Sequence, residues 1–266
     1  MPLDAPPAVS PTGETAAAAE ALVLDIVIPV YNEGPNILKV LKALDAAVTT
    51  PSRVLICYDH DDDDTLSTIA SHWRHGRLPI EFVRNQGRGA HGAVMTGLRM
   101  GQVPYALVYP GDDDYNAGIL DTMVAKARAG NDIVCASRFM SGGRMVGCPW
   151  LKAILVRTAA ATLFYLADAP THDATNGFRL FSRRVIERIK VDSTEGFTYS
   201  IELLVKVRRL RWGVAEVPAR WFERAAGQSR FRVLRWIPAY MRWVLYAFGT
   251  VYGRRPPSSV ELTREP

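Results

Sequence analysis

The sequence predicts an α/β fold with a mostly parallel, doubly wound sheet that carries helices on both faces. Five β-branched apolar runs alternate with segments of helical spacing along the first half of the chain, and the connections between them are short. Such alternation is typical of βαβ units, whose crossover helices cover a parallel sheet. With 266 residues, 48% of them apolar, the chain can bury one sizeable core.

The first half of the chain supplies these strands and helices in order. Residues 22–30, LVLDIVIPV, form a near-continuous apolar run, as expected for a strand that is buried on both faces. Helical spacing follows at Ile37, Leu38, Leu41 and Leu44. We expect the remaining strands at 53–58, 80–84, 105–109 and 132–137, with further helices at 64–74, 89–100 and 117–129.

The second half loses the regular alternation, and both ends of the chain differ in composition from the rest. We expect a helix, a strand, a helix and a strand at 150–166, 178–181, 198–209 and 213–219. Residues 22–232 would then form one domain, and the apolar-aromatic segment 233–253 a C-terminal helical extension. Residues 1–21 are rich in Ala and Pro without the apolar stretch of a secretion signal, which predicts a disordered segment. Residues 254–266 are expected to form a disordered tail.

Charge is distributed unevenly along the chain. Residues 1–137 hold 10 Lys/Arg and 17 Asp/Glu, whereas residues 138–255 hold 21 and 8. An acidic half joined to a basic half suits a cation site beside groups that bind anions, such as a phosphorylated substrate or an anionic membrane surface. No recognised nucleic-acid motif is present, so we expect no nucleic-acid partner. Three cysteines without metal-ligand spacing indicate a reducing, cytoplasmic environment.

Four polar loops follow the first four predicted strands. They are residues 31–34, 59–64, 85–89 and 111–116. Ligands of open α/β sheets bind at the carboxyl ends of the strands, so we expect these loops to converge on one edge.

The acidic loop GDDDYN, residues 111–116, is the first candidate site. Alternation at a strand end would let Asp112 and Asp114 face one divalent cation while Asp113 points away, and Mg²⁺ and Mn²⁺ prefer such oxygen ligands. The alternative is a solvated acidic turn or a cap of the following helix.

Other candidates come from the neighbouring loops and from the basic half. Asp59, at a strand end, could bind a base or ribose, and Arg88 precedes a helix in a glycine-rich loop suited to phosphate. Glu202 lies in a mostly apolar helix, where it is either buried and functional or simply exposed. Arg224 and Arg230 belong to a basic loop that could close over phosphate or be merely solvated.

An ordered set of motifs resembles the family-2 inverting glycosyltransferases. The set is IVIPVYNEGPNI (26–37), the strand that ends in Asp59, the glycine loop, the acidic loop, GFRLFSR (177–183) and ERAAGQSRF (223–231). It is most similar to the polyprenyl-phosphate (dolichyl-phosphate) mannosyltransferase branch, over about residues 23–232. The resemblance implies a GT-A fold, a GDP- or UDP-sugar donor, and Mg²⁺ or Mn²⁺ on its pyrophosphate.

The resemblance also implies roles for particular residues. It places Pro29, Tyr31, Glu33 and Asp59 around the nucleoside. It matches Asp112 and Asp114 to metal-binding positions, Arg138 and Arg144 to a phosphate-facing segment, and Arg224 and Arg230 to a closing loop. Pro110 stands where the family has the first aspartate of Asp-x-Asp, so the cation would rest on Asp112 and Asp114 alone.

The implied reaction is transfer of a sugar, with inversion, to a polyprenyl-phosphate lipid. Two alternatives stay open, namely a soluble or protein acceptor and a non-catalytic nucleotide-binding relative. The segment 233–253 carries Trp236, Tyr240, Trp243 and Tyr246 with interspersed arginines, as in a helix at a membrane interface. The alternative is a helix packed on the domain. The expected location is the cytoplasm, with peripheral attachment to the cytoplasmic face of the membrane.

Overall fold

A seven-stranded sheet forms the centre of the molecule. The computed structural model describes residues 21–222 and 233–263. All neighbouring strands of this sheet are parallel except β7, which runs antiparallel to both β4 and β5. The prediction of a mostly parallel α/β fold is therefore confirmed. The order of the strands is β3 (Ile80–Arg84), β2 (Ser52–Tyr58), β1 (Leu24–Pro29), β4 (Tyr105–Val108), β7 (Arg179–Ser182), β5 (Ile133–Ser137) and β8 (Val214–Pro218).

Strand β1 is buried on both faces, as its continuous apolar sequence predicts. Val27 packs into one hydrophobic cluster, whereas Ile26 and Ile28 pack into a second cluster on the other side. Because side chains alternate along a strand, this division places one cluster on each face of the sheet. The sheet thus requires helices on both sides.

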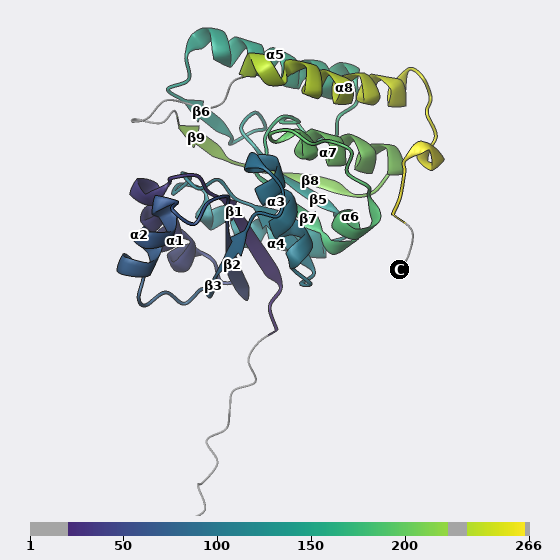
Figure 1. The fold of residues 1–266 in the computed structure, drawn as a ribbon. Helices are drawn as coiled ribbons and strands as arrows, with labels where there is room; N and C mark the ends of the chain where they lie inside the picture. Colours follow the sequence, from purple (N-terminus) through teal and green to yellow (C-terminus); the bar gives the residue numbers. More distant parts are fainter. Residues whose placement is uncertain (1–20, 223–232, 264–266) are drawn as a thin grey trace, which may run out of the picture.

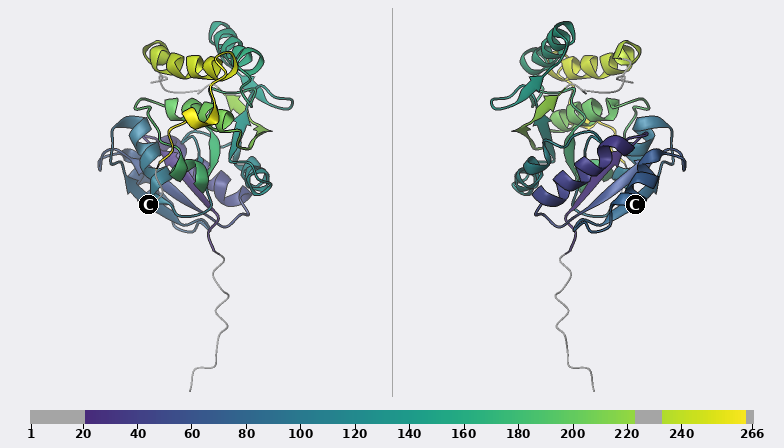
Figure 2. Two further views of the ribbon diagram at one scale, coloured as in Figure 1. Left: turned by 90° about the vertical axis from the view of Figure 1, so that its right-hand side faces the viewer. Right: turned by 90° about the vertical axis from the view of Figure 1, so that its left-hand side faces the viewer.

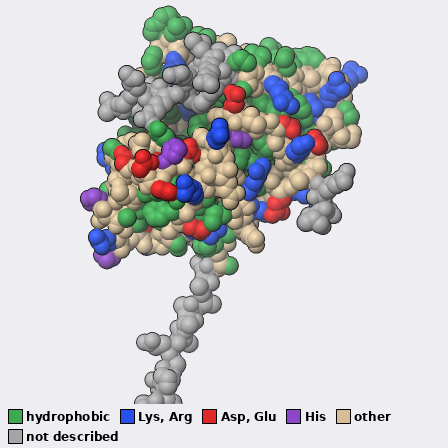
Figure 3. Space-filling view, viewed as in Figure 1, with side chains coloured by type: hydrophobic (Ala, Val, Ile, Leu, Met, Phe, Trp, Pro, Cys, Tyr) green, Lys and Arg blue, Asp and Glu red, His purple; other side chains and the backbone are tan. Residues whose placement is uncertain are grey.

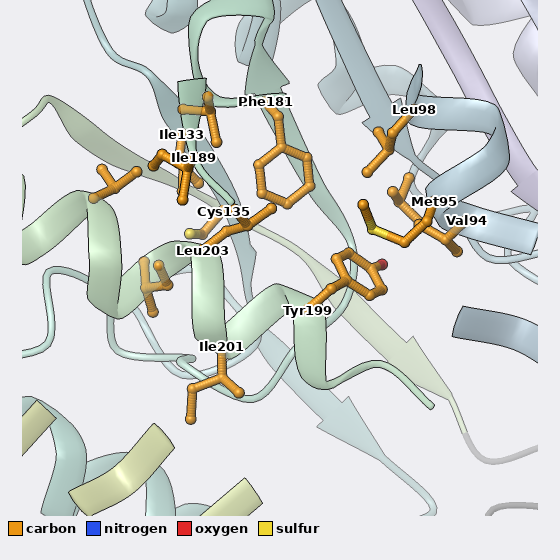
Figure 4. Close-up of a cluster of buried hydrophobic side chains, with 14 of the residues drawn as sticks. Val94, Met95, Leu98, Ile133, Cys135, Phe181, Ile189, Tyr199, Ile201 and Leu203 are labelled. Carbon is orange, nitrogen blue, oxygen red and sulfur yellow. The ribbon is translucent and has the colours of Figure 1, made fainter. Parts of the chain in front are cut away.

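The helices supply these two layers. Helices α1 (Gly34–Ala47), α2 (Asp64–His72) and α4 (Leu120–Arg128) contribute to the cluster on one face, with the 3₁₀ helix η1 (Ala117–Ile119) leading into α4. Helices α3 (Gly89–Met100), α6 (Arg183–Arg188) and α7 (Thr198–Leu210) contribute to the other. Figure 4 shows how Phe181, Met95 and Tyr199 meet in the cluster on the face covered by α3, α6 and α7, the same cluster that includes Val27. Both faces are covered, as expected.

An outer layer of two helices lies over α7. Helices α5 (Trp150–Leu166) and α8 (Val233–Val251) run side by side at the top of the molecule in all three views (Figures 1 and 2). Trp243 and Ala247 of α8 are buried in the cluster that α7 shares, so α8 is packed on the domain. Within the described residues, no helix has both the length and the apolar character needed to cross a bilayer.

Two short strands were not predicted from the sequence. Strands β6 (Arg144–Val146) and β9 (Arg220–Phe222) pair in parallel as a separate two-stranded sheet. Three residues are too few to show an alternating pattern, so these strands carry no periodic signal. Strand β9 follows β8 directly, and the backbone of its Arg220 bonds Asn116 of the acidic loop.

The C-terminal segment differs from the disordered tail that was expected over 254–266. Residues 254–263 are described, and they include the 3₁₀ helix η2 (Pro257–Ser259). Val260 is buried, Thr263 donates to the Arg188 carbonyl, and Leu262 bridges Ile189. These contacts involve residues distant in sequence, which composition alone does not reveal. Residues 1–20 of the predicted N-terminal disordered segment lie outside the described part of the chain.

Candidate active site

The loop that follows β1 is held against the start of α2. The backbone amides of Asn32, Glu33 and Gly34 donate to Asp63 Oδ2, Thr65 Oγ1 and Asp64 Oδ1 at 3.0, 2.9 and 2.9 Å. Asp63 also accepts from the Thr65 amide, so it caps α2. Two carboxylates of the acidic run after β2, those of Asp63 and Asp64, thus hold the loop after β1 in place.

Asp59 is linked to the loop that follows β3. Its carboxylate accepts a hydrogen bond from the Asn85 side-chain amide. Asn85 also accepts from the Gly87 amide at 2.8 Å, which folds the glycine-rich loop. A Cβ at Gly92 would lie 2.8 Å from the Asn85 side-chain oxygen, so glycine permits this close approach of helix and loop. The loops after β2 and β3 therefore meet, as the sheet topology predicts.

The acidic loop after β4 is organised around Asp113. Its Oδ1 accepts from the Tyr115 and Asn116 amides, both at 3.0 Å, and its Oδ2 accepts from Asn116 Nδ2 at 2.6 Å. Asn116 in turn bonds both the amide and the carbonyl of Arg220, at 2.9 and 2.7 Å. Asp113 thus shapes the turn, and Asn116 ties the turn to β9.

Burial governs the electrostatics of this turn. It raises the pKa of Asp113, an effect that exceeds the opposing hydrogen bonds from Asn116 and Tyr115. Burial also raises the pKa of Tyr109, and the charges of Asp113 and Asp114 raise it further. Burial therefore disfavours the charged form of Asp113, a cost that a positive charge nearby would offset.

The acidic loop lies beside the loop that follows β1. A Cβ at Gly111 would lie 3.6 Å from Glu33 Cγ and 3.6 Å from the Pro29 carbonyl oxygen. Tyr31 is half exposed, and it lines a cavity of about 290 Å³ together with Asn32, His60, Asp62 and Asp63. Pro29, Tyr31 and Glu33 are therefore brought to the same edge as Asp59 and the acidic loop.

The carboxylates suit a divalent cation only if other ligands complete the site. Among residues 21–222 and 233–263, no group of three His, Cys, Asp or Glu side chains could hold a metal ion together. Asp112 and Asp114 are half-buried and flank Asp113, whose oxygens are occupied by its own turn. Two carboxylates fit Mg²⁺ or Mn²⁺, which readily take remaining ligands from water and substrate phosphates.

Arg138 differs from the phosphate-facing residue suggested by the resemblance. Its Nε and Nη2 bond both oxygens of the fully buried Asp173 at 2.7 and 2.8 Å. Burial opposes the charge of Arg138, but Asp173 outweighs it and the pKa of Arg138 is raised. This guanidinium is committed to a structural ion pair. Arg144 is exposed on β6, and Arg88 is exposed at the start of α3.

Glu202 is buried, but its carboxylate is occupied. Its Oε1 accepts from Lys206 Nζ at 2.7 Å and from the Asp192 amide at 2.6 Å, while Oε2 accepts from the Ser193 amide at 2.8 Å. These contacts fix the chain before α7. The geometry therefore supports an anchoring role for Glu202 instead of the catalytic one. Arg224 and Arg230 lie outside the described residues.

Three polar residues in this arrangement were not singled out from the sequence. Asn85 and Asn116 connect the loops, and Asp173 holds Arg138. Asn116 and Asn85 give local signals, because each amide can bond the turn beside it. The partners that connect Asn85 and Asp173 to other segments, Asp59 and Arg138, are 26 and 35 residues away in sequence.

The sequence profile of "Glycosyl transferase family 2" matches residues 25–190. The dolichol-phosphate mannosyltransferase of Pyrococcus furiosus is 23% identical over 83% of this chain, which spans 64% of that relative's length. The polyprenol monophosphomannose synthase of Mycolicibacterium smegmatis is 26% identical over 77% of this chain and 79% of its own.

Solved structures of low sequence identity share the fold. A glucosyl-3-phosphoglycerate synthase from Mycobacterium tuberculosis, solved with Mn²⁺, UDP and glucosyl-3-phosphoglycerate, has a TM-score of 0.62 at 16% identity, covering 88% of this chain and 82% of its own. A mannosyl-3-phosphoglycerate synthase from Rubrobacter xylanophilus gives the same TM-score and identity over 92% and 78%. With these GT-A neighbours, and with a family profile that matches more than half of its residues, the chain belongs to glycosyl transferase family 2.

Proposed function

We propose that this protein transfers a sugar, with inversion, from a nucleotide-sugar to a polyprenyl-phosphate lipid. The observation that carries the proposal is the convergence of the loops after β1, β2, β3 and β4 on one edge of the sheet. The two curated relatives described above bear the names of polyprenyl-phosphate mannosyltransferases, which supports this acceptor.

The donor would lie across these loops. Asp59 would accept hydrogen bonds from the nucleoside, with Pro29, Tyr31 and Glu33 beside it, and Arg88 is placed to approach the diphosphate. Asp112 and Asp114 would hold Mg²⁺ or Mn²⁺ with the donor pyrophosphate. A bound cation would offset the charge that develops on the departing diphosphate. Arg224 and Arg230 are proposed, from the resemblance alone, to close on the same phosphates.

A phosphate acceptor would not require Glu202 as a base, and the Glu202 carboxylate is already hydrogen-bonded within the protein. The second pKa of a phosphate monoester is about 6, so at neutral pH the acceptor is mostly ionised and needs little help from a general base. A hydroxyl acceptor would need such a base. Both oxygens of Glu202 are bonded within the protein, so for a hydroxyl acceptor the base would have to be an aspartate of the acidic loops.

The acceptor is the part of the proposal that an assay must decide. The protein would be incubated with GDP- and UDP-sugars and Mn²⁺, together with either polyprenyl phosphate or 3-phosphoglycerate, the acceptor class that the fold neighbours' names suggest. Labelled sugar should enter the organic phase only with polyprenyl phosphate, and not in the Asp114→Asn variant. Transfer to the soluble phosphate alone would assign a soluble acceptor. Donor binding without hydrolysis or transfer would instead identify a non-catalytic nucleotide-binding relative.

The proposed location is the cytoplasm or the cytoplasmic face of the membrane, where nucleotide-sugars and a lipid phosphate would meet.

A further inference from the structure

Helix α5 exposes an apolar stripe to solvent. Its exposed apolar side chains lie on one side of the helix: Trp150 and Leu151, then Ile154 and Leu155 one turn later, and Tyr165 and Leu166 about three turns after those. Leu155 is 62% exposed, and Trp150 and Tyr165 are each about three-quarters exposed. Large apolar side chains gathered in one stripe mark a surface that binds a partner.

Helix α8 extends this surface. Met241 and Leu245 of α8 are exposed one turn apart, and Tyr252, directly after the end of the helix, is exposed as well, whereas Trp243 and Ala247 face the core. We call the exposed apolar residues of α5 and these three residues the α5–α8 face. Figure 3 shows hydrophobic side chains, with Lys and Arg among them, along the edge of the molecule where Figure 1 places the two helices. The aromatic residue Trp243, expected at an interface, is thus part of the core, and α5 provides most of the exposed stripe.

The two segments that form the α5–α8 face carry only basic charged residues, and the exposed Asp168 that follows α5 is paired with Arg208. The sequence contains no Asp or Glu between residues 139 and 167 or between 224 and 260. The basic residues of these segments include Arg157, Arg242, Arg254 and Arg255, all four of which are exposed. Two copies of this face would place like charges against each other, which disfavours self-association. An anionic lipid surface matches both the cations and the apolar side chains between them.

The α5–α8 face is connected to the candidate active site. Lys152 of α5 lies 5.1 Å from the centre of the Trp221 ring of β9. The next residue, Phe222, contacts Tyr115 of the acidic loop with ring centres 4.4 Å apart, and Asn116 bonds the backbone of Arg220. One end of the exposed stripe therefore adjoins the element that borders the acidic loop.

We propose that the α5–α8 face docks the protein on the surface of an anionic bilayer, with α5 lying in the headgroup region. The inference concerns attachment and stands whether or not the acceptor is a lipid. If the acceptor is a polyprenyl phosphate, as proposed above, docking through α5 would hold the acidic loop close to the layer in which the lipid's phosphate lies.

Vesicle binding of the purified full chain tests this face directly. The vesicles contain phosphatidylcholine, with or without phosphatidylglycerol, and neither donor nor polyprenyl phosphate, so docking is measured apart from transfer. The double variant Ile154→Gln/Leu155→Gln removes two exposed apolar side chains from α5. The matched control Phe82→Gln/Met100→Gln removes two that are 44% and 45% exposed on β3 and α3.

We expect the native protein and the control to sediment with phosphatidylglycerol-containing vesicles, and less so in high salt. Binding of the α5 variant should fall about tenfold or more, because burial of each apolar side chain is lost. Circular dichroism and Mn²⁺-dependent nucleotide affinity should match those of the native protein. Equal binding by both variants, or no binding by the native protein, would overturn the proposal. So would light scattering that shows a dimer dissociated by the α5 substitutions, since the face would then belong to a second copy.

Discussion

Asp113 is the aspartate of the acidic loop whose carboxylate shapes the turn. The turn amides of Tyr115 and Asn116 and the Asn116 side chain occupy both of its oxygens. Three adjacent aspartates therefore separate into one residue that builds the loop and two that are proposed to bind the cation. This distinction has measurable consequences for folding and for binding.

The aspartate substitutions should divide into two classes. Asp112→Asn and Asp114→Asn should each abolish Mn²⁺-dependent binding of nucleoside diphosphate, measured by calorimetry, with little loss of stability. Asp113→Asn sets an amide against the Asn116 side-chain amide, so it should lower the free energy of unfolding by about 1–2 kcal/mol. It should leave much of the Mn²⁺-dependent binding intact. If all three variants behave alike, or if nucleotide binds equally in chelator, the cation site is refuted.

Glu202 offers a test of anchoring against catalysis. Glu202→Ala leaves the buried Lys206 ammonium without one of its partners, and loss of one partner from a buried pair costs about 3–5 kcal/mol. We expect a loss of this order in chemical denaturation, moderated by the remaining contact of Lys206 with Asp192. Nucleotide affinity of the folded protein should be unchanged.

The exposed Glu195 provides the matched control for this substitution. Glu195→Ala should change the unfolding free energy by less than about 0.5 kcal/mol. A Glu202→Ala protein of native stability that has lost only turnover would contradict the anchoring role.

At the scale of elements, the turn between α1 and β2 is fastened to the first turn of α4. Asp121 accepts hydrogen bonds from the backbone amides and the hydroxyls of both Thr49 and Thr50, at 2.6–3.0 Å. Burial opposes ionisation of Asp121, but these four bonds dominate and its pKa is lowered. The Asp121 carboxylate thus connects the start of α4 with the residues that follow the end of α1, on the same face of the sheet.

The lowered pKa predicts how the contribution of Asp121 depends on pH. A carboxyl whose pKa is lower in the folded protein stabilises it above the unfolded pKa of about 3.9, and this contribution is lost as pH falls through the folded pKa. Asp121→Asn should therefore lower the urea midpoint at pH 7, and the difference from the native protein should shrink towards pH 3. A difference that stays constant across this range would contradict the assignment.

At the scale of the whole molecule, the C-terminal segment closes the face that carries α6 and α7. Arg209 of α7 donates to Ser259 at 3.1 Å, and Lys190 pairs with Glu261 at 2.8 Å. The exposed ion pair contributes little. The burial of Val260 is the larger effect.

Truncation after Gly253 should therefore destabilise the protein. We expect the free energy of unfolding to fall by about 2 kcal/mol, chiefly from exposure of Val260. Truncation after Thr263 keeps every contact just described and serves as the control. If both truncations leave the denaturation curve unchanged, the segment contributes nothing to stability, as a loose tail would.

Much of the fold was predictable because its signals are local. Strands β1, β2, β4 and β5 are buried on both faces and therefore appear in the sequence as short, continuous apolar runs. Helix α1 is buried on one side and shows helical spacing of its apolar residues. Ligands bind at the carboxyl ends of parallel strands, and this rule predicted from the sequence alone that the four polar loops lie at one edge of the sheet. The strands β6 and β9, three residues each, fall below the length at which such patterns can be read.

The sequence by itself determined the α/β class, the succession of strands and helices in the first half of the chain, the family and the edge at which the polar loops meet. Only the tertiary structure decided what each charged side chain does there. Arg138 and Glu202 matched functional positions by pattern, yet Asp173 and Lys206 engage them, while Asn116 connects the acidic loop to β9. Apart from the Glu202–Lys206 pair, one helical turn apart, these partners are distant in sequence. Periodicity arises from neighbours along the chain, whereas the state of a buried charge depends on whichever groups the fold places beside it.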